Sequence, residues 1–231
     1  MLYLVASPIG NLADISRRQA TTLMSSDVIL AEDTRSYRRL VDKIKEIYHV
    51  SPSPSQQVLS YYKEKEFELV PVVLDLLQEG KSISLVTDAG MPLISDPGSL
   101  LMKHVAKEGL SYTVVPGPSA VTTALLLSGF IFTEYLFIGF LPKKSGEVKK
   151  RIQAIQTAQD LFPGLVTVFF ESPHRIDKTL SLFNELYPSG QIAICREMTK
   201  KFEEVSRGTA SELLGRTYKG ELTVVVGYSN L

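Results

Sequence analysis

The sequence predicts an α/β protein built from two domains whose sheets are mainly parallel. Short apolar runs alternate with longer stretches of helical periodicity along the chain, which is typical of strands joined by crossover helices. Two of the runs, residues 83–86 and 112–115, lead directly into turns rich in glycine and proline. A length of 231 residues suffices for one large domain or two small ones.

Each strand is predicted from a short apolar run bounded by polar or turn-forming residues. The predicted strands are residues 2–6, 28–31, 58–60, 83–86, 112–115, 135–139, 165–170, 191–195 and 221–226.

The helices between them are predicted from capping residues and apolar spacing. Asp14 is expected to cap a helix whose apolar face includes Ile15 and Leu23. A second helix is expected over residues 66–79 and ends at Gly80. A third is expected to begin near Ser95 and Asp96.

Composition indicates a soluble protein of a reducing compartment. The chain is 44% hydrophobic and 22% charged, as in ordinary globular proteins. The one cysteine, Cys195, excludes an intramolecular disulfide and suits the cytosol. Residues 2–6 lack a preceding basic region and are interpreted as a first strand, not a signal peptide. The apolar run at residues 120–131 is too short to span a bilayer. We therefore expect the protein to be cytoplasmic.

The domain boundary is predicted at the proline-glycine turn of residues 116–118. This gives an N-terminal domain of residues 1–117 and a C-terminal domain of residues 118–231. Residues 51–57, with three serines and two prolines, are expected to form an exposed insertion.

Residues 88–98 form the most informative turn. They contain two carboxylates, two glycines and two prolines after an apolar strand, and such turns bind ligands at the carboxyl edge of open α/β sheets. Several other sites are excluded because no G-x-G-x-x-G, P-loop or G-x-S-x-G motif is present. His49, His104, His174 and Cys195 are too scattered to predict a metal site.

Seven segments together carry a resemblance to a known family. They are LYLVASPIGN (2–11), AEDTR (31–35), DAGMPLISDPG (88–98), PGPSA (116–120), GFLP (139–142), FESPHR (170–175) and REMTK (196–200). The chain resembles the bacterial small-subunit ribosomal RNA methyltransferase I family of the tetrapyrrole methylase superfamily. The resemblance implies two α/β domains with the cofactor cleft between them. It also implies a homodimer that uses S-adenosylmethionine to methylate the 2′-hydroxyl of a decoding-region cytidine in 16S rRNA.

The resemblance also implies which residues contact the cofactor. Small residues and backbone groups of the two proline-glycine turns would hold S-adenosylmethionine, although Ser95, Asp96 and Ser119 are also ordinary helix caps. The cofactor-binding candidates are Pro8, Asp88, Ala89, Gly90, Ile94, Ser95, Asp96, Ser119, Ala120 and Phe170.

Methylation of a ribose hydroxyl requires alignment with the methyl group and a proton acceptor. The candidate catalytic residues are Glu32, Glu171 and His174, each of which also has a plausible structural role. The candidate RNA contacts are Asp33, Arg35, Arg175, Arg196 and Lys200.

The charge of the chain does not decide whether the substrate is RNA or a small molecule. The net charge is zero, whereas proteins that bind RNA phosphates usually carry a basic excess, so local clusters at residues 35–45 and 143–151 would have to serve. One alternative is a methylase of the same fold that acts on a tetrapyrrole or another small molecule. The other is a non-catalytic nucleotide- or RNA-binding protein.

Overall fold

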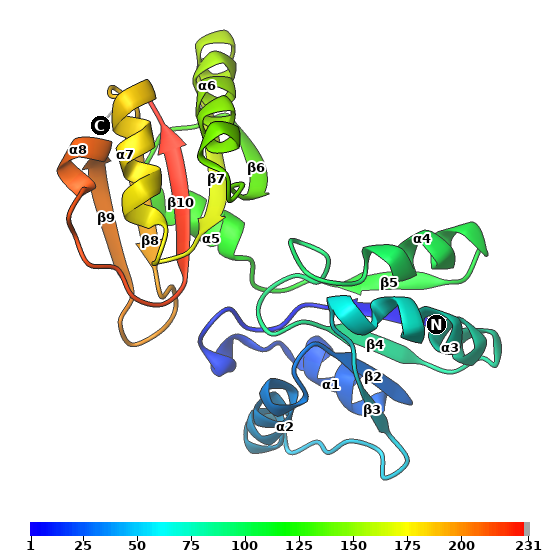
Figure 1. The fold of residues 1–231 in the computed structure, drawn as a ribbon. Helices are drawn as coiled ribbons and strands as arrows, with labels where there is room; N and C mark the ends of the chain where they lie inside the picture. Colours follow the sequence, from blue (N-terminus) through cyan, green and yellow to red (C-terminus); the bar gives the residue numbers. More distant parts are fainter. Residues whose placement is uncertain (229–231) are drawn as a thin grey trace. The chain divides into compact units, whose positions relative to one another are not determined.

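The computed structural model describes residues 1–228, and the chain divides into two compact units. The first is Met1–Ser119 and the second begins at Ala120 (Figure 1). The predicted boundary, after residue 117, lies two residues before this division. Residues 229–231, at the end of the predicted C-terminal domain, lie outside the described residues. None of the helices within residues 1–228 is long and apolar enough to span a membrane.

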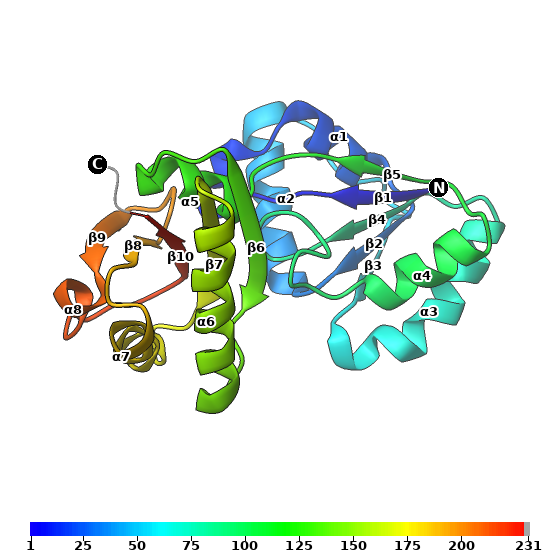
Figure 2. The ribbon, with the colours of Figure 1, turned by 90° about the horizontal axis from the view of Figure 1, so that it is seen from above.

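The first unit contains a parallel sheet. Its strands are β1 (Leu2–Val5), β2 (Val28–Ala31), β3 (Gln57–Ser60), β4 (Ile83–Val86) and β5 (Tyr112–Val115). They lie in the order β3-β2-β4-β1-β5, and every pairing is parallel (Figure 2). The predicted strands of this half are confirmed to within one residue at each end. The strands are parallel because the helix after each strand carries the chain back to the edge of the sheet where that strand began, so that the next strand runs in the same direction.

Helices cover both faces of this sheet. They are α1 (Arg17–Ser25), α2 (Thr34–Tyr48), α3 (Lys63–Gln78) and α4 (Ser99–Lys107), with a short 3₁₀ helix η1 (Leu12–Asp14). One buried cluster joins α1 and α2 to one face, and another joins α3 and α4 to the opposite face. Strands β2 and β4 are buried along their whole length, which explains why both are almost entirely apolar, with Ser84 of β4 the exception.

Two predicted helix starts in this unit are wrong. Asp14 lies in η1, and α1 is capped by Ser16, whose side chain accepts from the Gln19 amide while the Gln19 side chain accepts from the Ser16 amide. This is a reciprocal capping box. The helix expected near Ser95 begins instead at Ser99, because Ser95 adopts a left-handed conformation with φ 72° that a helix does not accommodate.

The second unit contains a mixed sheet. Its strands are β6 (Glu134–Phe140), β7 (Leu165–Glu171), β8 (Gln191–Arg196), β9 (Glu204–Thr209) and β10 (Leu222–Gly227). They lie in the order β6-β7-β10-β8-β9, with only β6 and β7 parallel. The expectation of a mainly parallel sheet is therefore wrong here, because β8, β9 and β10 connect without long crossover helices. Strand β9 was not expected, since its sequence EVSRGT has no apolar run.

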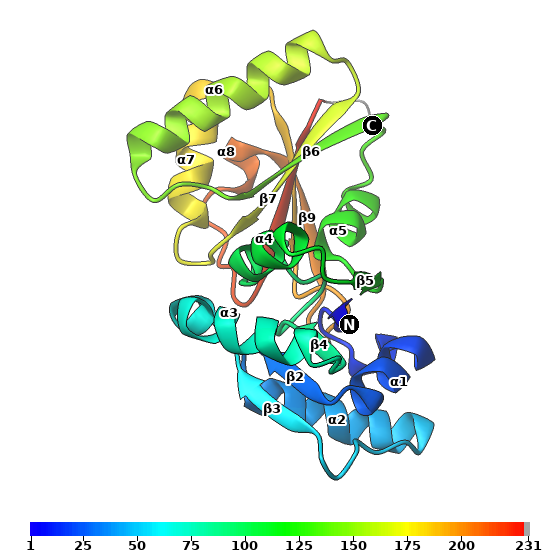
Figure 3. The same ribbon diagram turned by 90° about the vertical axis from the view of Figure 1, so that its right-hand side faces the viewer.

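The helices of the second unit are α5 (Ala120–Ser128), α6 (Ser145–Leu161), α7 (Ile176–Leu186) and α8 (Ala210–Leu213). The main core packs α6, α7 and α8 against one face of the sheet, and α5 lies on the other (Figure 3). Cys195 of β8 is buried on the α5 side, where its thiol faces the Ala124 carbonyl at 3.7 Å. Burial raises the pKa of this thiol to about 12.

Candidate functional site

The carboxyl edge of the first sheet gathers most of the predicted site. Because its strands are parallel, the segments that follow β1, β2, β4 and β5 all leave from this edge. The chain leaves β1 toward the face covered by α1 and leaves β4 toward the face covered by α4. Neighbouring strands with connections to opposite faces create the crevice in which α/β proteins bind ligands.

A backbone clasp joins the first two of these segments. The Ser7 amide donates to the Gly90 carbonyl at 2.8 Å, and the Gly90 amide donates to the Ser7 carbonyl at 3.1 Å. The Ser7 hydroxyl also donates to the Thr87 carbonyl at 3.0 Å. Pro8 is buried directly after the clasp. The clasp therefore holds the Pro8 turn beside Gly90, both of them predicted cofactor contacts.

The segment from Gly90 to α4 has an unusual backbone. Leu93 and Ser95 have φ values of 71° and 72°, a conformation that costs free energy for residues with side chains and recurs at functional sites. Ile94 and Ser95 are exposed. Neither Ser95 nor Asp96 caps α4, whose N-cap is Gly98. The capping explanation considered for Ser95 and Asp96 therefore does not apply at this helix.

Three carboxylates at this edge have raised pKa values. Partial burial, followed by repulsion from Glu32, raises the pKa of Asp96 to about 6. Partial desolvation is likewise the main cause of the raised pKa of Glu32 and of Asp88, with repulsion from Asp33 adding to both. The Glu32 carboxylate accepts one long hydrogen bond, 3.5 Å, from the Asp88 amide. Clustered carboxylates of raised pKa mark a place suited to a cation or to proton transfer.

Asp33 and Arg35 form a separate pair at the start of α2. The Asp33 carboxylate caps α2 through the Arg35 amide and also binds the Arg35 guanidinium at 2.8 Å. These hydrogen bonds lower the pKa of Asp33 to about 2. The Arg35 side chain is 87% exposed, and Arg38 and Arg39 line the same shallow depression. The depression therefore presents three guanidinium groups together with the carboxylates of Asp33 and Asp42.

Asp96→Asn is expected to stabilise the protein at neutral pH. Because the pKa of Asp96 is raised from 3.8 to about 6, folding favours the protonated carboxyl. This contribution to stability is complete below about pH 4 and is lost as the pH rises through about 6. Two pKa units correspond to about 3 kcal/mol, which the partial exposure of Asp96 reduces to about 1 kcal/mol.

Thermal unfolding at two pH values tests this expectation. At pH ~7.5 the variant should melt about 2–4 °C above the unmodified protein, and at pH ~4 the two should nearly coincide. An equal gain at both pH values would show that ionisation of Asp96 is not the cause.

The second unit places three predicted segments at one edge of its sheet. Glu171 and Arg196 both lie opposite Leu222 of β10, so the segments after β7 and β8 emerge on either side of that strand. The segment after β6 also reaches this edge, because Arg175 donates to the carbonyls of Leu141 and Pro142 at 3.2 and 3.3 Å.

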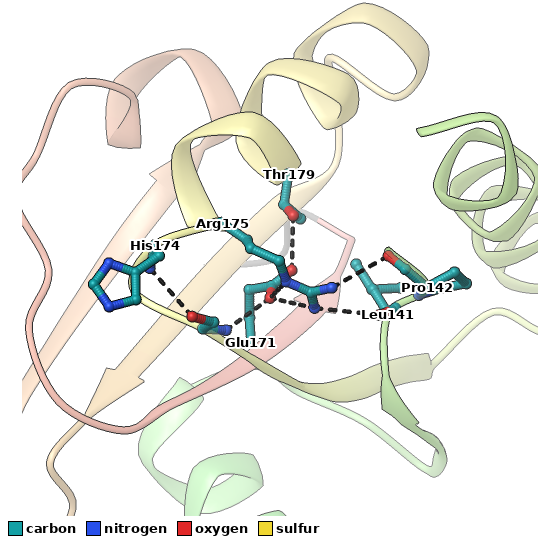
Figure 4. Close-up of polar contacts among 7 residues, drawn as sticks. Leu141, Pro142, Glu171, His174, Arg175 and Thr179 are labelled. Carbon is teal, nitrogen blue, oxygen red and sulfur yellow. Dashed lines mark hydrogen bonds and ion pairs between the residues drawn. The ribbon is translucent and has the colours of Figure 1, made fainter. Parts of the chain in front are cut away.

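Glu171 is the centre of a saturated polar network (Figure 4). One carboxylate oxygen accepts from the Ser172 amide at 2.7 Å and from the Arg175 guanidinium at 2.6 Å. The other accepts from the Thr179 hydroxyl at 2.7 Å. The Glu171 side chain is only 1% exposed. Since both oxygens are occupied, these contacts favour a structural role over proton transfer.

His174 and Phe170 flank this network. The imidazole of His174 is exposed and points away from Glu171 and Arg175 (Figure 4). Phe170 packs its ring against Phe137 and Phe140, with centroids 5.0 and 5.4 Å apart. Ser119 and Ala120, at the start of α5, are half-buried.

Arg196 and Lys200 hold the β8–β9 connection together. Arg196 donates to Glu204 and to the carbonyls of Phe202 and Lys219. Lys200 binds Glu197 at 3.0 Å and Glu221 at 2.9 Å. Both side chains are partnered inside the unit and only 20% and 27% exposed, whereas the Arg35 side chain, although paired with Asp33, is 87% exposed.

Glu66, which was not among the predicted site residues, connects α3 to the candidate site. Its side chain accepts from the backbone amides of Gly98 and Leu100 at 3.0 and 2.9 Å. These partners lie more than thirty positions away along the chain, so no local motif signals the contact.

Comparisons with known proteins agree with this architecture. Residues 1–214 match the family described as Tetrapyrrole (Corrin/Porphyrin) Methylases. A protein named ribosomal RNA small subunit methyltransferase I from Bacillus subtilis (strain 168) is 38% identical, over 100% of this chain and 76% of the relative. The protein of the same name from Thermotoga maritima is 40% identical over 97% of each.

Solved structures with low sequence identity share the fold. The methyltransferase CobJ superposes with a TM-score of 0.70 at 16% identity, over 99% of this chain and 94% of that one. A uroporphyrin-III-C-methyltransferase from Thermus thermophilus gives 0.62 at 16% identity, over 98% and 93%. The predicted fold class, two α/β domains of tetrapyrrole methylase type, is confirmed.

The chain therefore belongs to the tetrapyrrole methylase family and is a methyltransferase. Within that family it belongs with the ribosomal RNA small subunit methyltransferase I proteins, which it matches over nearly its whole length at 38–40% identity. The resemblance noted from the seven sequence segments is thus confirmed.

Proposed function

We propose that this protein uses S-adenosylmethionine to methylate the 2′-hydroxyl of a cytidine in the decoding region of 16S rRNA. The observation that carries the proposal is the match, through both units, to relatives named ribosomal RNA small subunit methyltransferase I. Action in the cytoplasm as a homodimer is part of the same proposal.

The donor groups at the first sheet edge fit the proposed cofactor. S-adenosylmethionine carries a positive sulfonium and a positive ammonium group and supplies an electrophilic methyl group when bound. Asp88 and Asp96 offer carboxylates of raised pKa, which a bound cation would stabilise in their charged form. Asp88 and Ala89, which are exposed residues directly before the Gly90 clasp, would offer further backbone polar groups. The remaining proposed cofactor contacts are Pro8, Ile94, Ser95, Ser119, Ala120 and Phe170.

Glu32 is the strongest candidate for the proton acceptor. Within residues 1–228, its carboxylate accepts only the long hydrogen bond from the Asp88 amide, whereas both oxygens of Glu171 are occupied. The raised pKa of Glu32 also makes it a better base than an ordinary carboxylate. His174, with an exposed imidazole, is retained as the second candidate.

Among the proposed RNA contacts, Arg35 has the side chain most exposed to solvent. Arg175, Arg196 and Lys200 are engaged inside the second unit, so their contribution would come from the shape they give to the loops. Arg35 instead lies exposed beside Arg38 and Arg39, and grouped cations contact RNA phosphates.

A methyl-transfer assay tests the function directly. The protein is incubated with radiolabelled S-adenosylmethionine and, in separate reactions, small ribosomal subunits, naked 16S rRNA or uroporphyrinogen. Label in the rRNA, mapped by nuclease digestion and mass spectrometry to a cytidine 2′-O-methyl group, is the expected result. Label in uroporphyrinogen alone would assign a tetrapyrrole substrate. No transfer to any acceptor, with RNA binding retained, would favour the non-catalytic alternative.

Calorimetry tests the cofactor independently of the acceptor. One molecule of S-adenosylmethionine or of its demethylated product should bind per chain, and NAD and ATP should give no heat. Absence of both heat and thermal stabilisation with the two methylation ligands would remove the cofactor assignment.

Arg35→Glu is expected to reduce methylation of small subunits without changing cofactor affinity. The reversal places a negative charge where RNA phosphates would approach, and it also repels Asp33. A loss of about tenfold in kcat/KM corresponds to about 1.4 kcal/mol, a reasonable value for one phosphate contact. Lys107→Glu is the control, because Lys107 is exposed at the far end of α4. Equal activity of the two variants would exclude Arg35 from RNA binding.

A further inference from the structure

Helix α4 begins without a side-chain cap of its own. Its N-cap residue is Gly98, which has no side chain to accept from the first amides of the helix. The first amides of any helix need partners from elsewhere. Those amides lie directly after residues 88–96, which contain most of the proposed cofactor contacts.

The missing cap is supplied by Glu66 from α3. A single oxygen, Oε1, accepts from the amides of Gly98, Leu100 and Leu101 at 3.0, 2.9 and 3.3 Å. The Tyr61 hydroxyl donates to the same oxygen at 3.2 Å. Glu66 is 9% exposed and Tyr61 is fully buried. A carboxylate at a helix N-terminus is further favoured by the helix dipole.

Glu66 therefore anchors one end of a segment whose other end is already anchored. The clasp with Ser7 holds Gly90, and Glu66 holds Gly98. Between them, Leu93 and Ser95 keep left-handed backbones that persist only where the surroundings enforce them. Leu93 covers Gly98 so closely that a Cβ on Gly98 would lie 2.5 Å from Leu93 Cδ2. Loss of the second anchor would let the residues between the two anchors relax.

We infer that Glu66 is a positioning residue for the cofactor: it fixes the N-terminus of α4 and thereby holds residues 91–97 in the conformation that binds S-adenosylmethionine. The inference rests on the proposed function. It assigns Glu66 no contact with the substrate or with the proton acceptor Glu32, which lies on a different segment. Removing Glu66 should therefore weaken cofactor binding and leave the turnover of the saturated enzyme largely intact.

The test compares Glu66→Ala and Glu66→Gln with Glu68→Ala, a matched control on the exposed side of α3. Glu66→Ala should raise the KM for S-adenosylmethionine and the Kd for S-adenosylhomocysteine by about tenfold or more, with kcat within about twofold. Glu66→Gln keeps a neutral acceptor, whose hydrogen bonds are about half as strong, so a loss of about threefold is expected. Glu68→Ala should change neither constant.

Hydrogen exchange of the ligand-free proteins gives a readout that does not depend on the cofactor assignment. Amides of residues 91–101 should exchange faster in both Glu66 variants, while β1 and β4 remain as protected as in the unmodified protein. Unchanged exchange there, or an equal fall in kcat and cofactor affinity, would overturn the inference. If Glu66→Ala does not fold, Glu66→Gln decides by the same two criteria. Failure of the unmodified protein to bind S-adenosylhomocysteine would instead contradict the proposed function.

Discussion

Gly90→Val is expected to abolish binding of S-adenosylmethionine while the protein remains folded. Gly90 has φ 79°, which a β-branched residue strongly resists. A Cβ at this position would meet Ile9 Cγ2 at 3.4 Å and the Pro118 carbonyl at 3.8 Å, so the interior has room for it. The loss would arise because a residue that resists this φ would distort the turn and its clasp with Ser7, and with them the backbone proposed to hold the cofactor.

Gly80→Val provides a control for backbone strain. Gly80 has φ 83°, and a Cβ at this position would meet no heavy atom of residues 1–228 within 4 Å beyond its immediate chain neighbours. It precedes β4, at the opposite edge of the sheet from Gly90. The two variants should lose similar stability, about 1–2 kcal/mol. Only Gly90→Val should raise the Kd beyond about a hundredfold, as measured by calorimetry with circular dichroism confirming the fold. Equal binding by both would place the cofactor elsewhere.

Glu32→Gln is expected to lower turnover by about 10²-fold or more, the usual scale for a positioned general base. Since the base must be deprotonated, activity should fall as the pH decreases through the pKa of Glu32, which burial raises. The acidic limb of the pH–rate profile should therefore lie at a higher pH than an unperturbed glutamate would give, and Glu32→Gln should remove it.

Glu171→Gln and His174→Asn complete the comparison. Glu171→Gln should destabilise the fold by about 2–3 kcal/mol, because it breaks a buried ion pair with Arg175, yet it should keep turnover within about threefold below its melting transition. His174→Asn should also stay within about threefold. If His174→Asn or Glu171→Gln shows the hundredfold loss and Glu32→Gln does not, the base is in the second unit.

The fold of the first unit was largely predictable because its signals are local. Strand β2 (VILA) is an uninterrupted apolar run, and β4 (ISLV) departs from one only at Ser84; such runs stand out against the more polar helices. Strand β9 escaped prediction because it is an edge strand, with one neighbour and a single aliphatic residue, Val205, in its sequence EVSRGT.

The candidate site, too, was predictable only where its signals are local in the sequence. The turns after β1, β2 and β4 were identifiable from glycine, proline and carboxylates next to apolar strands. The contacts of Glu66 and the full occupation of Glu171 were not, because both depend on which backbone or side-chain donors the fold brings near a carboxylate. The error at Asp14 was avoidable, since Ser16 and Gln19 have the spacing of a capping box.

The buried thiol of Cys195 has a practical consequence. With a pKa of about 12, this single cysteine carries almost no thiolate at neutral pH, and thiolate is the form that reacts with maleimides. A cysteine introduced at an exposed site such as Lys107 or Lys201 would thus be labelled selectively without first removing the native one. Fluorophores attached to both positions would follow, in solution and in real time, the response of the protein to cofactor and ribosomal subunits.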